Sequence, residues 1–91
     1  MTALEQFFNG IQPCPSCGSA IAREHFGHEP AGRDGRLAYL FCEHCNLARI
    51  VVLVFVGGHY EIDFWQDIPP DNAVERARFH EHLEAARRLV A

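Results

Sequence analysis

The chain has 91 residues, a formal net charge of −4 at pH 7 and four cysteines. This length makes one small domain, residues 1–91, whose apolar core gives marginal stability, so a covalent or metal staple is expected. The longest purely apolar run, 50–56, is too short to cross a membrane, and no signal-peptide pattern occurs. We therefore expect a soluble cytoplasmic protein, where cysteines favour metal or redox chemistry over disulfides.

The first residues carry the signals of a short helix. Thr2 and Glu5 have the spacing of a capping box, and Asn9-Gly10 is a C-terminal stop signal. Its apolar face consists of Leu4, Phe7 and Phe8. A short N-terminal helix that packs on the rest of the domain is therefore predicted.

Two cysteine pairs with the same internal spacing follow. They are Cys14 and Cys17 in CPSCG, and Cys42 and Cys45 in CEHCN. A two-residue gap lets both thiolates of one turn reach the same ion, and two such turns complete a tetrahedral shell. Gly18 and Asn46 follow the pairs, and both residue types tolerate the positive φ that such turns need. The pattern predicts one metal site with four sulfur ligands.

At these residues the chain resembles the zinc-ribbon family, whose cysteine turns often read C-P-x-C-G, as residues 14–18 do. The likeness covers residues 12–50 and implies a fold element with structural Zn2+, without implying an activity. Zinc ribbons occur in transcription factors, polymerase subunits, ribosomal proteins and small adaptors. Rubredoxins hold iron with similar turns, so a redox protein is an alternative. His44 is expected to point outward, because four thiolates already complete the shell.

The segment between the cysteine pairs predicts a first hairpin. Its turn signal is Asp34-Gly35 in GRDGR, and its candidate strands are 20–26 and 37–41. Together with the hairpin that follows the second cysteine pair, these strands predict an antiparallel sheet of three or four strands.

Residues 49–65 predict a second hairpin with two different faces. Gly57-Gly58 is a two-residue turn, and counting back from it places Val51 opposite Phe64. One face is then wholly apolar, while the other sets an apolar strand beside an acidic one. The apolar residues of this second face are Ile50, Val52 and Val54. They need cover from the last helix, from a partner or from a second copy in a homodimer.

The acidic strand of this hairpin is the candidate partner site. Alternation from the turn places Glu61, Asp63 and Trp65 on one face, and no Lys or Arg occurs from 59 to 75. The candidate residues are Trp65, Glu61, Asp63 and Asp67. A protein partner with a basic surface would meet an aromatic anchor and carboxylates there. The alternative for Trp65 is a core position beneath the last helix.

A longer helix follows the prolines at 69 and 70. Asp71 or Asn72 can cap it, Asn72 and Glu75 have capping-box spacing, and the helix is expected to run to about Leu89. Its narrow apolar stripe consists of Phe79, Leu83, Ala86 and Val90. The stripe predicts that the helix lies on the sheet. The fold class is therefore α+β, an antiparallel sheet with a short N-terminal and a longer C-terminal helix.

Charge and motif content favour protein binding over other functions. The chain has eight arginines and twelve acidic residues, and four thiolates around one Zn2+ add about two negative charges. Nucleic acid is therefore a poor default partner. A closed four-sulfur shell offers zinc no open position, and no nucleophile with an adjacent base occurs, so an enzyme is not expected. We predict a non-catalytic protein-interaction module, an adaptor or regulator of a larger machine. The alternatives are a nucleic-acid-binding transcription or translation accessory and a rubredoxin-like redox protein.

Overall fold

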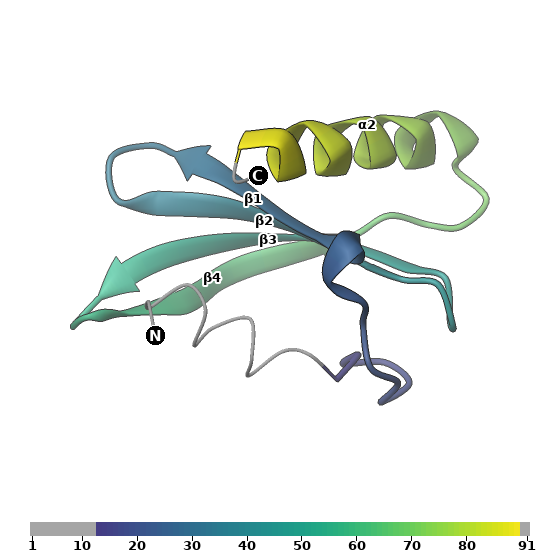
Figure 1. Ribbon diagram of the computed structural model, residues 1–91, viewed down its shortest axis with the longest axis horizontal. Coiled ribbons are helices and arrows are strands. Elements are labelled where there is room, and N and C mark those ends of the chain that lie inside the picture. Colours follow the sequence, from purple (N-terminus) through teal and green to yellow (C-terminus); the bar gives the residue numbers. More distant parts are fainter. Residues whose placement is uncertain (1–12, 90–91) are drawn as a thin grey trace.

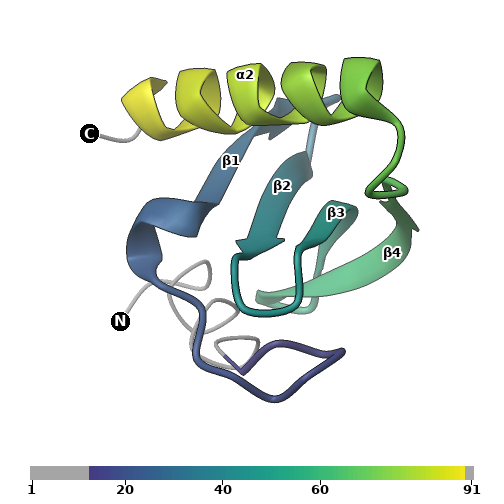
Figure 2. The same ribbon diagram turned by 90° about the vertical axis from the view of Figure 1, so that its right-hand side faces the viewer.

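The structure is a computed structural model that describes residues 13–89. Four strands form one antiparallel sheet in the order β1-β2-β3-β4, and a C-terminal helix lies across it (Figures 1 and 2). The elements are η1 (Arg23–His25), β1 (Phe26–Ala31), β2 (Gly35–Cys42), β3 (Leu47–Val56), β4 (His59–Asp67) and α2 (Ala73–Leu89). The predicted α+β class, antiparallel sheet and C-terminal helix are confirmed. The predicted N-terminal helix lies outside the described residues.

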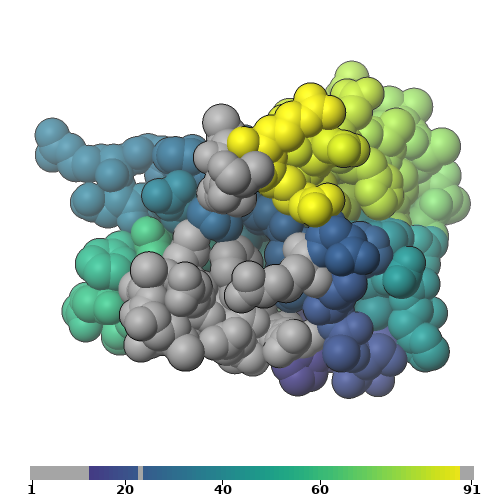
Figure 3. Space-filling model, in the orientation of Figure 1, coloured from purple at the N-terminus to yellow at the C-terminus, as the bar shows by residue number. Residues whose placement is uncertain are grey.

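The chain order of the strands determines at which end of the sheet each turn lies. Each strand pairs with the next one along the chain, so the β1–β2 and β3–β4 turns share one end of the sheet. The β2–β3 turn, which contains the second cysteine pair, lies at the opposite end (Figure 1). Figure 3 shows the β1–β2 turn, in blue, projecting beyond the body of the molecule.

The first hairpin differs from its prediction in both its turn and its first strand. The turn is the three-residue loop 32–34, and Gly32 has a φ of 66°, which suits glycine. Gly35 joins β2 and pairs with Ala31. Residues 20–25 do not belong to the strand, because the chain leaves the first cysteine turn there and forms η1. The predicted strand 20–26 is therefore wrong, and β1 begins at its last residue.

The second hairpin keeps its predicted turn but not its whole register. Gly57 and Gly58 have φ values of 61° and 85°, and the pairs from Val56↔His59 to Leu53↔Ile62 follow the predicted count. The register then shifts, because the pairing skips Asp63 in β4. Such an extra residue is a β-bulge, which changes every pair beyond it.

The bulge reverses the predicted faces of two aromatic residues. Val52 pairs with Phe64 and Val51 pairs with Trp65, so the predicted pairing of Val51 with Phe64 is wrong. Since paired residues share a face, Trp65 lies on the face of Val51 and Phe64 on the face of Val52. The predicted alternation that put Trp65 beside Glu61 is therefore also wrong.

The helix lies over β1 and β2 on one face of the sheet. Asn72 Oδ1 accepts a hydrogen bond of 3.2 Å from the Glu75 N–H, which confirms the predicted cap. The core beneath the helix contains Tyr39, Ala48, Ile68, Phe79, Leu83 and Ala86, with Ile50 packed against it. The predicted stripe is confirmed as far as Ala86, and Val90 lies outside the described residues. The helix therefore covers Ile50, one of the options left open by the sequence.

A glycine and a tyrosine fix how the helix meets the sheet. A Cβ on Gly27 in β1 would lie 3.0 Å from the Leu83 carbonyl oxygen, so only glycine allows this close approach. Tyr39 in β2 packs edge-to-face on Phe79, and its hydroxyl donates a hydrogen bond of 2.8 Å to Glu29 Oε1. Burial and this hydrogen bond raise the pKa of Tyr39.

The opposite face carries two smaller buried clusters. One contains Ala38, Val51 and Leu53, with Tyr60 against it. The other contains Cys14, Ile21, Leu40 and Cys42, with Phe26 and Leu47 against it. Strand alternation puts Leu40 and Cys42 on the side of the sheet away from α2, and Cys14 is buried against them. Two of the four cysteines are therefore anchored to this face. Trp65 lies on the same face at 54% exposure, and α2 does not cover it.

Candidate metal centre

The first cysteine pair lies in a tight turn before the sheet. The Cys14 N–H donates to the Ser19 carbonyl at 2.8 Å, and the Gly18 N–H donates to the Cys14 carbonyl at 2.9 Å. Gly18 has a φ of 79°, the left-handed conformation expected from the sequence. The Ser16 N–H lies 3.4 Å from Cys14 Sγ, the amide-to-sulfur contact typical of cysteine metal turns.

The second cysteine pair lies in the turn between two strands. Cys42 is the last residue of β2, and β3 begins at Leu47. Asn46 has a φ of 61°, as its match to Gly18 predicted. Because the two strands fix both ends of this turn, the sheet sets the position of the second pair. Figure 2 shows the first turn, in purple, lying beneath the β2–β3 turn.

The four sulfur atoms form one compact group. Cys14 Sγ lies 3.7 Å from Cys45 Sγ, and Cys17 Sγ lies 3.7 Å from Cys42 Sγ. All four atoms lie within 4.8 Å of one another. A tetrahedral ion with metal–sulfur bonds of about 2.3 Å would separate its ligands by about 3.8 Å. The predicted ligand residues therefore come together in a geometry that can hold a metal ion.

Two of the thiols have opposite pKa shifts. Hydrogen bonds from the Ser19 side chain and backbone lower the pKa of Cys17 to about 6. Desolvation, followed by hydrogen bonds with the other three thiols, raises the pKa of Cys45 to about 12. Without metal, Cys17 therefore loses its proton at a lower pH than Cys45 does.

These shifts predict a pH dependence of zinc affinity. Zinc must displace the Cys45 proton at neutral pH, so the apparent affinity is expected to fall as the pH is lowered from 8. The fall should steepen below about pH 6, where Cys17 also takes up a proton, given its lowered pKa. Competition with a chromophoric zinc chelator at a series of pH values measures this. A flat profile between pH 8 and 5 contradicts it.

A cation of the same chain occupies part of the predicted partner site. Arg49 in β3 donates to both carboxylate oxygens of Asp67, at 2.6 and 3.0 Å, and its guanidinium lies 5.1 Å from the Trp65 ring centroid. The hydrogen bond with Asp67 raises the pKa of Arg49. Arg49 therefore joins β3 to β4 beside Trp65, a link that sequence spacing did not reveal.

The four predicted partner-site residues do not form one patch. Trp65 and Asp67 share Arg49, on the face away from α2. Glu61 pairs with Val54 on the other face, where its carboxylate lies 2.9 Å from His59 Nε2. Asp63 is the bulge residue between the two groups. The strand presents two separate surfaces along its length.

A second arginine ties the metal site to the helix. Arg76 in α2 donates to Asn46 Oδ1 at 3.1 Å and to the Ile68 carbonyl at 2.7 and 3.1 Å. Asn46 belongs to the second cysteine turn, so this side chain joins that turn to the start of the helix. This contact cannot be predicted from the sequence, because a 30-residue separation carries no periodic pattern.

Among residues 13–89, the four cysteines are the one group of potential metal ligands that the structure brings together. His44 is exposed and lies outside that group, as expected. No helix in this part of the chain is long and apolar enough to span a bilayer. Fold and site together define a small α+β domain with a cluster of four cysteines that could hold a metal ion.

No known protein family, curated protein or solved structure matches the chain. The cysteine cluster is consistent with a zinc-ribbon-like site, but that resemblance rests on the cysteine turns alone.

Proposed function

We propose that the chain is a non-catalytic zinc-binding module that binds another protein, as a small adaptor or regulator of a larger assembly. Zinc suits a shell of four thiolates, whereas Mg2+ and Ca2+ prefer oxygen ligands. Four sulfur ligands leave the ion no open position for a substrate or an attacking water. The metal would then hold two turns together, as a structural ion does.

The observation that carries the binding role is the exposure of large apolar side chains on the second hairpin. Phe64 and Trp65 are 57% and 54% exposed. Phe55, Val56 and Ile62 on the same hairpin are each at least 45% exposed. Exposed aromatic side chains gathered on one element are typical of a protein interface.

The charge beside these side chains supports a basic partner. β4 carries Glu61, Asp63 and Asp67, and no Lys or Arg occurs between residues 59 and 75. Complementary charge speeds the encounter of two proteins and selects among partners. A protein with a basic surface is therefore the proposed ligand, with aromatic anchors supplying most of the affinity.

Affinity capture from the native host, followed by titration of the purified partner, tests this proposal. Phe64→Ser is expected to weaken binding at least about tenfold, as loss of an aromatic anchor does. Val74→Ser is the matched control, because Val74 is 64% exposed on α2, away from the hairpin. Equal binding by both variants, or a partner that binds only through α2, contradicts the proposal.

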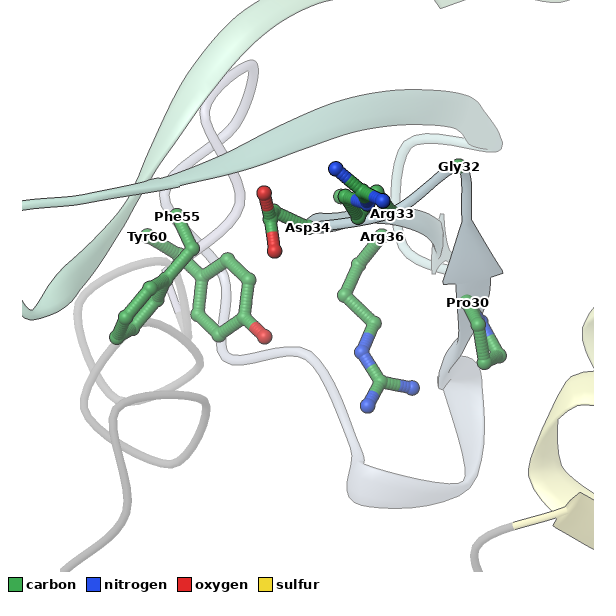
Figure 4. Close-up of a pocket in the computed structure, with 8 residues that line it drawn as sticks. Pro30, Gly32, Arg33, Asp34, Arg36, Phe55 and Tyr60 are labelled. Atoms are coloured by element: carbon green, nitrogen blue, oxygen red, sulfur yellow. The ribbon is translucent and has the colours of Figure 1, made fainter.

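One hollow favours nucleic acid as the second candidate ligand. Its volume is about 210 Å³, and its lining includes Arg33, Arg36, Phe55 and Tyr60, shown as sticks in Figure 4. Proteins that bind single-stranded nucleic acid use basic side chains such as arginine to contact phosphates and aromatic rings to stack on bases. Asp34 in the same hollow and the net charge of −4 oppose this role. Binding of a labelled oligonucleotide that falls steeply with salt would favour it over the proposed function.

A further inference from the structure

The two edges of the sheet differ in how they are protected. β1 has six residues, contains Pro30 and lies against α2, where Gly27 meets Leu83. Proline and a covering helix are common ways to block an edge strand. β4 has nine residues and no proline, and it pairs only with β3 among the described strands. Among residues 13–89, the outer backbone groups of β4 are therefore the edge of this sheet with which no other strand pairs.

The side chains of β4 are also accessible along its length. Every residue of β4 is exposed except Tyr60, which is half-buried. An edge strand of nine residues extends about 30 Å and offers a row of N–H and C=O groups to another strand. Proteins that recognise an extended segment by strand addition use an edge of this kind.

The negative charge of β4 indicates whether a second copy of this chain or a different protein would pair with its edge. Two β4 strands paired with each other would bring two sets of Glu61 and Asp63 into one junction, with no Lys or Arg among residues 59–75 of either copy. Asp67 is already paired with Arg49 of β3. Like charges facing each other across strands are destabilising. A strand that carries Arg or Lys would instead neutralise these carboxylates.

We infer that β4 binds an extended basic segment of a partner protein, which adds to the sheet as a fifth strand beyond β4. This inference rests on the proposed function and specifies its ligand. The segment alternates basic with β-branched or aromatic side chains, because the two faces of β4 offer different contacts. On the α2 side these are Glu61 and Phe64, and on the other side Ile62 and Trp65.

The bulge divides the edge into two parts. Asp63 interrupts regular pairing with β3, so His59–Ile62 and Phe64–Asp67 are regular stretches separated by one extra carboxylate. Bulges at edges hinder indiscriminate pairing. An added strand makes its backbone hydrogen bonds along one stretch and can place a cation beside Asp63.

Synthetic peptides test the inference on the full zinc-loaded chain. The probe is an extended peptide of about seven alternating arginine and valine residues, a usual strand length. The first control replaces arginine with glutamate, and the second methylates alternate backbone nitrogens, which removes hydrogen-bond donors but keeps every charge. Trp65 fluorescence and calorimetry report affinity, and amide hydrogen exchange reports the backbone of β4.

The arginine peptide is expected to bind at least about tenfold more tightly than either control, and to slow amide exchange at alternate residues of β4. Equal binding of the methylated peptide overturns strand addition but leaves a basic partner in place. Equal binding of the glutamate peptide overturns the charge argument as well. Failure of the arginine peptide, with a captured partner still sensitive to Phe64→Ser, overturns the inference and spares the proposed function.

A charge substitution at the edge supplies an independent check. Phe64→Lys is expected to abolish binding of the arginine peptide, and Val74→Lys, at an exposed helix position, to leave it unchanged. Sedimentation of the wild-type chain decides on the second copy. If the wild-type chain is a dimer and the Phe64→Lys variant is a monomer, β4 pairs with a second copy of itself. This result would overturn the inference of a basic partner.

Discussion

Replacement of Cys42 by serine is expected to unfold most of the domain at neutral pH and to release its zinc. Cys42 ends β2 and is 2% exposed, so the change removes a metal ligand and also introduces a hydroxyl into a buried cluster. Structural zinc supplies about 10–16 kcal/mol in small zinc-binding peptides, comparable with the whole stability of a small domain, about 5–15 kcal/mol. Far-ultraviolet circular dichroism and elemental analysis of the purified protein measure both effects.

His44→Ser is the matched control for this change. His44 lies in the same turn, is exposed and is not a ligand, so its variant should keep one zinc ion and the wild-type unfolding midpoint. Excess chelator should unfold the wild-type chain, and added zinc should refold it. A folded Cys42→Ser protein with its metal retained would refute structural zinc. Iron in the purified wild-type protein would favour the rubredoxin-like alternative.

The metal ligands could be predicted because their signal is local. A two-residue gap and a residue with positive φ define each turn, and the structure shows both features at Gly18 and Asn46. The C-terminal helix could be predicted for the same reason, from the cap at Asn72 and a stripe of period 3.6. Neither inference needed knowledge of which strands are neighbours.

The register of the second hairpin could be predicted only near its turn. Counting from Gly57-Gly58 assumes one residue opposite one residue, and this holds as far as Leu53↔Ile62. Asp63 has no partner in β3 and shifts the register, and no residue type predicts a bulge from the sequence. One skipped residue therefore moved Trp65 to the other face and divided the predicted partner site.

Contacts between residues far apart in the chain also could not be predicted from the sequence. Arg49 lies between Asp67 and the Trp65 ring, and Arg76 joins Asn46 to the helix. The sequence shows each arginine only as a positive charge, because its partners depend on the strand order. In the structure, Arg49 joins β3 to β4, and Arg76 joins the second cysteine turn to α2.

Phe79→Ala is expected to produce the largest loss of stability among substitutions outside the metal site. The ring is 1% exposed and packs edge-to-face on Tyr39, in the core that holds α2 on the sheet. Truncation of a buried phenylalanine removes its apolar contacts and leaves a cavity, which together cost about 3–5 kcal/mol. Urea unfolding of the zinc-loaded protein measures the loss.

Val74→Ala on the same helix separates this effect from a change in helix propensity. Val74 is 64% exposed, so its variant should stay within about 0.5 kcal/mol of the wild type. If Phe79→Ala does not fold, Phe79→Leu keeps part of the buried volume and should give a measurable, smaller loss. Because Phe79 lies on the face away from the metal cluster, Phe79→Leu should still bind one zinc ion. A Phe79→Ala variant as stable as Val74→Ala would mean that α2 does not pack on the sheet as described.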